Sequence, residues 1–265
     1  MSVIEAVKKG FGLAAKLMNV VLIFFVFNVV IGLISLPLAN PARAGNPGIV
    51  VVSIISSIVF FLMFIFLQGG ALGMVKDQIK TAASSMGSFV EYGKKFYLRI
   101  LALLVIYILI AIGVVLVLSL TSAGILLIGD NIITRSIVAT LVTVIAVAAI
   151  TFLIYPIYSI IADDTTAVSA LKKGIVAAKA NFWKTLGLFI VLLLVSLVIS
   201  LAIGFIIGVI TIPFSVNISQ IVIAVVNAAV QSYIPVVMMG AFMSFYLALG
   251  GAAPQQVPTA EGEGM

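Results

Sequence analysis

Six long apolar runs restrict the fold of this 265-residue chain more than any other feature of its sequence. They cover residues 17–39, 49–75, 98–120, 136–161, 186–210 and 221–249. Each reaches the roughly 20 residues that an α-helix needs to cross about 30 Å of hydrocarbon. With 64% hydrophobic and only 8% charged residues, the chain could not cover a water-soluble surface. The sequence therefore predicts an all-α fold, a polytopic transmembrane helical bundle with six spans in a single membrane domain over residues 1–249.

The basic residues are distributed unevenly between the spans. Twelve of the fourteen Lys and Arg residues precede the first span or lie between spans two and three or four and five. Only Arg43 and Arg135 fall on the opposite side. By the positive-inside rule, both termini are cytoplasmic and the protein lies in the cytoplasmic membrane. This placement also favours anionic lipid headgroups, and not nucleic acid, as the partner of the net charge of +6.

The first span has a rival interpretation as a cleavable signal peptide, because Ala42-Arg43-Ala44 has the form of a cleavage site. The preceding apolar run is too long for a signal peptide, and Pro41 lies within the cleavage region. A retained span is the favoured reading.

Basic amphipathic segments precede the odd-numbered spans, and we expect them to lie at the membrane interface. They occupy residues 2–16, 85–97 and 168–182. Asp164 or Thr165 is the expected N-cap of the third. The predicted apolar faces are Val3, Val7, Phe11, Ala14 and Met18 in the first segment, Met86, Phe89, Gly93 and Phe96 in the second, and Val168, Leu171, Ile175, Ala178 and Phe182 in the third.

An internal repeat explains why these segments recur. Ala6-Val7-Lys8-Lys9-Gly10 matches Ala170-Leu171-Lys172-Lys173-Gly174. Asp77 precedes Phe96-Tyr97 by the same 19 residues that separate Asp163 from Phe182-Trp183. We interpret the chain as three parallel repeats of a two-span hairpin, at about 1–76, 77–162 and 163–249. Coincidence is the alternative, since apolar sequences align easily. Residues 250–265 are expected to be a disordered cytoplasmic tail.

The sequence offers little for catalysis. It contains no cysteine and no histidine, and no charged residue lies in the central part of a span. Asp77, Asp163 and Asp164 could be metal ligands or phosphodiesterase carboxylates at headgroup level, but helix capping and charge balance are the favoured roles. We therefore expect a protein that is not an enzyme and needs neither cofactor nor metal.

Three sets of residues are candidates for binding or packing. The sixth span carries polar residues that either join helices or line a polar cavity: Asn227, Gln231, Ser232, Tyr233 and Pro235. The expected contacts of anionic headgroups are Lys94, Lys95, Lys172, Lys173, Lys179 and Trp183. Small residues that let helices approach closely, within one chain or between chains, are Gly69, Gly73, Ser196, Ser200, Gly204 and Gly208.

Over residues 155–190 an aspartate pair, an Ala-rich amphipathic helix and the run Asn181-Phe182-Trp183-Lys184 follow one another. This pattern resembles a broad, uncharacterised group of six-span bacterial and archaeal membrane proteins. The group includes YciC-like proteins and the membrane domain fused to some glycerophosphoryl diester phosphodiesterases. The resemblance extends over residues 68–249 and implies the six-span fold. Residues 1–265 hold no phosphodiesterase catalytic domain, so that activity is not implied.

Two functions remain in competition. The first is non-enzymatic binding or movement of a lipid-like or small apolar molecule. The second is a structural or assembly role with another membrane protein or a second copy of the chain. A membrane-embedded enzyme acting on lipid headgroups is a distant third.

The topology can be tested with single cysteines, because the chain has none of its own. Ala44→Cys and Asp130→Cys should react with an impermeant thiol reagent from outside the cell. Ala83→Cys and Val168→Cys should react only after the membrane is opened. The reverse pattern would contradict the orientation drawn from the basic residues.

Overall fold

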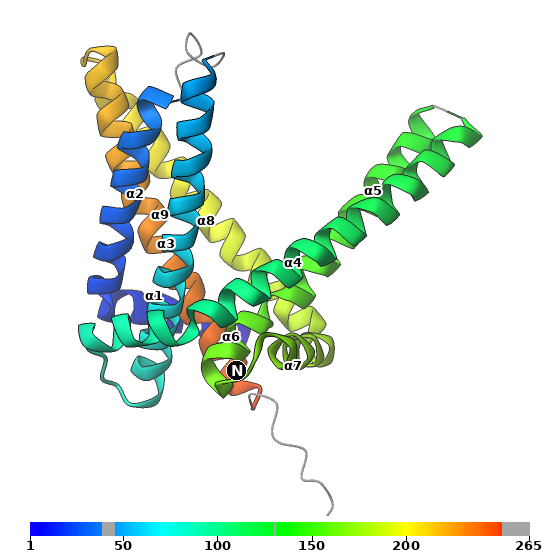
Figure 1. The fold of residues 1–265 in the computed structure, drawn as a ribbon, viewed down its shortest axis with the longest axis horizontal. Helices are drawn as coiled ribbons and strands as arrows, with labels where there is room; N and C mark the ends of the chain where they lie inside the picture. Colours follow the sequence, from blue (N-terminus) through cyan, green and yellow to red (C-terminus); the bar gives the residue numbers. More distant parts are fainter. Residues whose placement is uncertain (39–45, 130, 251–265) are drawn as a thin grey trace, which may run out of the picture.

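The computed structural model of the protein describes residues 1–38, 46–129 and 131–250 (Figure 1). Over these residues the chain forms α-helices and short turns and no strand, which confirms the all-α prediction. The helices are α1 (Val3–Lys16), α2 (Met18–Leu38), α3 (Pro47–Lys80), α4 (Met86–Ile128), α5 (Ile132–Leu153), α6 (Tyr155–Asp163), α7 (Ala167–Ala180), α8 (Phe182–Thr211) and α9 (Val216–Ala248). Arg43, position 130 and the predicted tail beyond Gly250 lie outside the described residues.

Six helical stretches are long and apolar enough to cross a membrane. They are Met18–Ser35, Pro47–Lys80, Met86–Leu127, Ile132–Asp163, Phe182–Thr211 and Ile218–Ala248. Large apolar side chains remain on their outer surfaces, and Leu127, Ile132 and Phe205 are 88%, 82% and 75% exposed. Apolar surface of this extent indicates a lipid environment. The prediction of a multi-pass membrane protein is confirmed.

The second amphipathic segment is not a separate helix. Helix α4 continues for 43 residues from Met86 to Ile128 and contains both this segment and the third span. At a rise of 1.5 Å per residue it is about 65 Å long, roughly twice the thickness of the hydrocarbon layer. No proline interrupts this part of the chain, so the helix propagates from one segment into the other.

A proline breaks the fourth span in two. Helix α5 ends at Leu153, and α6 begins at Tyr155 with Pro156 as its second residue. Proline has no backbone donor, so the ladder of helical hydrogen bonds is interrupted here. The hydroxyl of Tyr107 in α4 donates to the Leu153 carbonyl oxygen at 2.7 Å. The break is thereby stabilised by a neighbouring span, as backbone groups in a membrane require.

Helices α1, α6 and α7 and the first turns of α4 gather at one end of the molecule, here called the basal layer (Figure 1). Helices α2, α3, α8 and α9 extend from this layer as one group, and the α4–α5 hairpin leaves it at an angle (Figure 1). Phe96, Tyr155 and Tyr246, which are among the largest fully buried side chains, lie in or beside the layer. The basal layer is therefore where all parts of the chain meet.

Glycines allow α1 and α7 to touch the spans beside them. A Cβ atom on Gly10 of α1 would lie 2.5 Å from the carbonyl oxygen of Val237 in α9. Gly174 of α7 contacts Pro156 of α6 in the same way, against both the backbone nitrogen and the ring. Each contact leaves no room for a side chain, so only glycine permits it.

The first turns of α4 pack on α3 through similar contacts. A Cβ atom on Gly93 would lie 2.7 Å from the ring of Phe66 in α3. In the opposite direction, a Cβ on Gly70 of α3 would lie 2.6 Å from the carbonyl oxygen of Phe89. Both helices thus contribute glycine to one interface.

The residues of α1 and α7 that are buried within the protein are mostly not those of the predicted apolar faces. Val168 and Met18, which belong to those predicted faces, are 56% and 54% exposed. Lipid solvates large apolar side chains as well as a protein interior does, so small residues occupy the contacts between helices. On the predicted face in the first turns of α4, Phe89, Gly93 and Phe96 are buried, whereas Met86 is exposed. The residues buried within the two helices are Ala6, Gly10, Leu13 and Ala14 in α1 and Ala167, Ala170, Gly174 and Ala178 in α7.

Two glycines of α1 provide a matched test of this packing. Gly10→Ala should destabilise the protein by about 1–3 kcal/mol, because the new methyl group overlaps the backbone of α9. Gly12→Ala should be neutral or stabilising by up to about 1 kcal/mol, since alanine favours a helix and no atom lies within 4 Å of the added Cβ. Denaturation in mixed micelles would measure both. Equal effects of the two substitutions would contradict the close contact.

Candidate functional site

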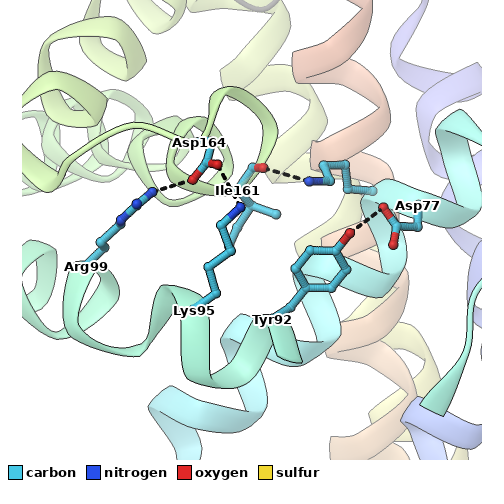
Figure 2. A network of polar contacts seen from close by, with 7 residues as sticks. Asp77, Tyr92, Lys95, Arg99, Ile161 and Asp164 are labelled. Atoms are coloured by element: carbon cyan, nitrogen blue, oxygen red, sulfur yellow. Dashed lines mark hydrogen bonds and ion pairs between the residues drawn. The ribbon is translucent and has the colours of Figure 1, made fainter. Parts of the chain in front are cut away.

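The basal layer holds a network of charged side chains that are distant in sequence. Asp164 accepts a hydrogen bond from Lys95 at 2.7 Å and a second one from Arg99 (Figure 2). Lys95 and Arg99 lie in the first turns of α4, whereas Asp164 lies between α6 and α7. The aspartate adopts a left-handed conformation, with φ 53° and ψ 42°, which aspartate tolerates better than most residues. The two ion pairs connect the end of the fourth span to the first turns of the helix that contains the third span.

Lys76 and Tyr92 extend the network toward α3. The Lys76 ammonium donates to the carbonyl oxygen of Ile161 at 3.3 Å and lies 5.0 Å from the centre of the Tyr92 ring. The Tyr92 hydroxyl donates to Asp77 at 3.0 Å (Figure 2). The cation is held by a carbonyl dipole and an aromatic face, and not by a carboxylate.

Asp163 joins α6 to α7 and α9. Its carboxylate accepts hydrogen bonds from the hydroxyls of Ser159 at 3.1 Å and Tyr246 at 2.8 Å. The ammonium of Lys173 lies 3.5 Å from the same oxygen atom. The Asp163 side chain is only 17% exposed. These partners enclose the Asp163 carboxylate more than that of Asp164, whose side chain is 51% exposed.

Neither Asp163 nor Asp164 caps helix α7, contrary to expectation. Its N-cap is Thr166, which makes no side-chain capping bond, so Asp164 and Thr165 were wrong choices. Asp164 balances charge across the layer instead. Hydrogen bonds from Lys95 and Arg99 lower the pKa of its carboxyl group. This contribution to stability is therefore present above the ordinary aspartate pKa of about 4 and is lost as the pH falls through the lowered value.

The predicted headgroup contacts divide into two groups. Lys95 and Lys173 are already engaged in ion pairs within the chain. Trp183 is 79% exposed, and its ring packs edge-on against Phe182 with centroids 5.4 Å apart. Of the predicted headgroup lysines, those that are exposed and have no ion pair among the described residues are Lys94, Lys172 and Lys179.

A groove of about 410 Å³ lies between α2 and α9. Two of the predicted cavity residues, Asn227 and Gln231, line it. Asn28 of α2 and Gln220 of α9 line it as well. Among the described residues, none of these four amide groups has a hydrogen-bond partner. An unpaired amide beside hydrocarbon is costly, so four of them in one groove call for a ligand or a partner.

The other predicted cavity residues do not line the groove. Ser232 is buried, and its hydroxyl donates to the carbonyl oxygen of Ala229 at 2.8 Å. The Tyr233 ring packs against Phe11 of α1, with centroids 6.3 Å apart. Pro235 is partly buried inside α9. The structure therefore brings together Asn227 and Gln231 and separates them from these three residues.

The two sets of small residues also differ. Gly69 and Gly73 are buried in α3, where both contact the first turns of α4. By contrast, no atom lies within 4 Å of a Cβ placed on Gly204 or Gly208 of α8. Ser196 is partly buried and Ser200 is exposed on the same helix. The first pair packs within the chain, and most of the second set has no contact inside it.

Two parts of this arrangement were missed at the sequence level. Asn28 and Gln220 could have been found, because Gln220 precedes Asn227 by two helical turns and Asn28 is the one amide in the middle of the first span. The ion pairs of Asp164 could not, since 69 and 65 residues separate it from its partners. Among the described residues, no three His, Cys, Asp or Glu side chains are grouped so that they could hold a metal ion.

The network predicts a stability cost when Asp163 is removed. Asp163→Ala should destabilise the protein by about 1–3 kcal/mol, because two hydroxyls and an ammonium group lose their acceptor. Glu91→Ala removes an exposed carboxylate and should cost at most about 0.5 kcal/mol. Denaturation in mixed micelles near neutral pH would compare them. Equal stability of the two variants would refute a structural role for Asp163.

No curated protein and no solved structure matches the chain. The family comparison supports an uncharacterised family but gives no link to YciC-like proteins or to the phosphodiesterase membrane domain. Its match covers residues 1–249, which include the basal layer, the groove and all six candidate spans. The chain belongs to the family described as Domain of unknown function (DUF7847).

Proposed function

We propose that this membrane protein binds a lipid-like molecule in the groove between α2 and α9, and that it acts by binding or moving this molecule and not by catalysis. The observation that carries the proposal is the set of unpaired amides at Asn28, Gln220, Asn227 and Gln231. Gln220 lies near the end of α9 remote from the basal layer, and Gln231 lies three turns deeper. The amides thus form a polar track from one membrane surface toward the middle of the bundle.

The chemistry of the groove favours an uncharged amphiphile. No Lys, Arg, Asp or Glu side chain lines it, so a charged group would have no counter-ion there. Amides both donate and accept, and therefore suit a ligand with hydroxyl or carbonyl groups. Ile31 and Ile223 provide apolar walls for a hydrocarbon tail. Diacylglycerols, quinones and isoprenoid alcohols have this combination of groups.

The proposed architecture is that of a single domain over residues 1–249, made of three parallel repeats at about 1–76, 77–162 and 163–249. The glycine contacts support it. Gly10 and Gly174 occupy matching places in the repeat, Gly93 lies in the segment before the third span, and each packs on an even-numbered span of the preceding repeat. For the first repeat the preceding one is the last, since α1 packs on α9. Three related units arranged in a ring, each packed on the preceding one, would produce this cyclic order.

The proposed orientation puts the basal layer at the cytoplasmic face of the cytoplasmic membrane. The twelve basic residues on the predicted inner side all belong to elements in or next to this layer, whereas Arg135 lies at the start of α5, at the far end of its hairpin (Figure 1). Anionic headgroups would then contact the exposed Lys94, Lys172 and Lys179. On this view α1, the first turns of α4, and α7 are the basic helices at the membrane interface.

A second candidate function is assembly with another membrane protein or a second copy of the chain. The specific observation in its favour is the face of α8 around Ser200, Gly204 and Gly208, which is exposed along the helix. Small residues at four-residue spacing allow close approach of a helix from another chain. A defined oligomer or a stoichiometric partner in native mass spectra would support this function.

The groove is tested by replacing one amide. Gln231→Leu should weaken binding of a short-chain diacylglycerol about tenfold, the equivalent of one lost hydrogen bond. Its effect on stability should be about 1 kcal/mol or less, since amide contacts between spans are worth little more. Native mass spectrometry in a mild detergent would count bound molecules, and thermal unfolding would follow stability.

Gln68→Leu is the matched control, because Gln68 is an amide of the same size in α3 that does not line the groove. It should leave diacylglycerol binding unchanged. A large loss of stability in Gln231→Leu without a separate loss of binding would refute the groove as a binding site. So would equal weakening by both substitutions.

A further inference from the structure

A second pocket, of about 280 Å³, lies in the basal layer between α1, α3 and α9. Its walls are Gly12 and Leu13 of α1 and Ile79 of α3. Its polar side chains are Lys9 and Lys16 of α1 and Ser244 of α9. No acidic side chain lines this pocket, so its character is positive.

Ser244 is a buried polar residue without a partner. It is 5% exposed, and its hydroxyl oxygen is buried and makes no hydrogen bond within the described part of the chain. A serine inside a helix ordinarily bonds to the carbonyl four residues earlier, as Ser57 and Ser136 do here. Buried hydroxyls without a partner are rare and point to a group missing from the protein alone.

The ammonium groups of Lys9 and Lys16 are not neutralised by a strong carboxylate partner. Lys16 has no carboxylate partner among the described residues. Lys9 lies 3.8 Å from Glu5, but both side chains of this pair are more than half exposed. Such a pair holds its members only weakly, so the Lys9 ammonium remains available to a second anion. The pocket therefore combines two ammonium groups with a hydroxyl donor.

We propose that this pocket binds a phosphate ester, with Lys9 and Lys16 neutralising the phosphate and the Ser244 hydroxyl donating to one of its oxygen atoms. Lysine ammonium groups bind phosphate as point charges. Leu13 and Ile79 offer apolar contact for the carbon skeleton next to the ester. The group recognised can belong to a phospholipid headgroup or to a soluble phosphate ester. The site is separate from the groove between α2 and α9, and neither requires the other.

Two probes distinguish these sources. Phosphatidylglycerol presents the phosphate in a lipid, and glycerol 3-phosphate presents it in solution. Binding of the first would be measured by native mass spectrometry and binding of the second by calorimetry in the same detergent. Binding of phosphatidylglycerol alone identifies a headgroup site, and binding of glycerol 3-phosphate identifies a site for a soluble ester. Failure of both to bind would overturn the proposal.

The charge contribution is tested by Lys9→Gln with Lys16→Gln against Lys8→Gln with Lys184→Gln. Both pairs remove two exposed positive charges from the elements in or next to the basal layer, but Lys8 and Lys184 do not line the pocket. The first pair should weaken binding of the probe about tenfold or more, and the control pair far less. Equal weakening would show a general attraction of the basic surface and would overturn the site.

The hydroxyl is tested by Ser244→Ala. Because this group is buried without a partner, its removal should leave the melting temperature of the protein without ligand unchanged or raise it. The same substitution should weaken binding of the phosphate probe several-fold. A lower melting temperature with unchanged binding would show that Ser244 serves packing alone, and would remove it from the site.

Discussion

The basal layer depends on direct contact between helix backbones, and glycine is the residue that permits it. Gly10, Gly70 and Gly174 each lie against the backbone of another helix, where a Cβ atom would not fit. Between apolar helices in lipid there is little hydrophobic drive, so close van der Waals contact must hold them together. The contact of Gly70 with the Phe89 carbonyl also holds the first turns of α4, which carry Lys95 and Arg99 to Asp164. The ion pairs thus build on an arrangement that the glycines make possible.

Lipid as a solvent explains where the polar groups of this protein lie. The charged network lies in the basal layer, and internal polar groups such as Ser232 and Thr211 donate to carbonyls of their own helices. The amides between α2 and α9 depart from this rule. A Cβ atom placed on Gly32 of α2 would lie 4.0 Å from the Cβ atom of Ala224 in α9, so the two helices are close here, yet the neighbouring amides remain unpaired. Unpaired amides beside hydrocarbon are costly unless a ligand or partner binds them, and this cost is the physical basis of the proposed binding groove.

The sequence was sufficient for the spans, the class of protein and the proline break, because each follows from local composition or from a single residue. Which face of α1 and α7 is buried could not be read from the same pattern. The amphipathic pattern gives the apolar faces, which include Val168 and Met18, but a large side chain is as stable in lipid as in a core, so only the fit between helices decides which residues are buried. The partners of Asp163 and Asp164 were beyond reach for a different reason: Tyr246 lies 83 residues from Asp163, and no local signal encodes that distance. Two of the four groove amides, Asn227 and Gln231, were predicted, whereas Gln220 on α9 and Asn28 on α2 were missed.

The contact between α1 and α9 has a consequence for biosynthesis. Gly10 packs against Ala241, so α1 leaves the ribosome well before the helix on which it packs. At about 5–20 residues per second, translation alone imposes a delay of roughly 10–50 s before that contact can form. During this interval α1 has no partner helix. A short amphipathic helix with Lys8, Lys9 and Lys16 can bind an anionic membrane surface in the meantime. The contact between α1 and α9 can therefore form only after the sixth span has been synthesised, and a nascent chain that stalls earlier keeps α1 without its partner.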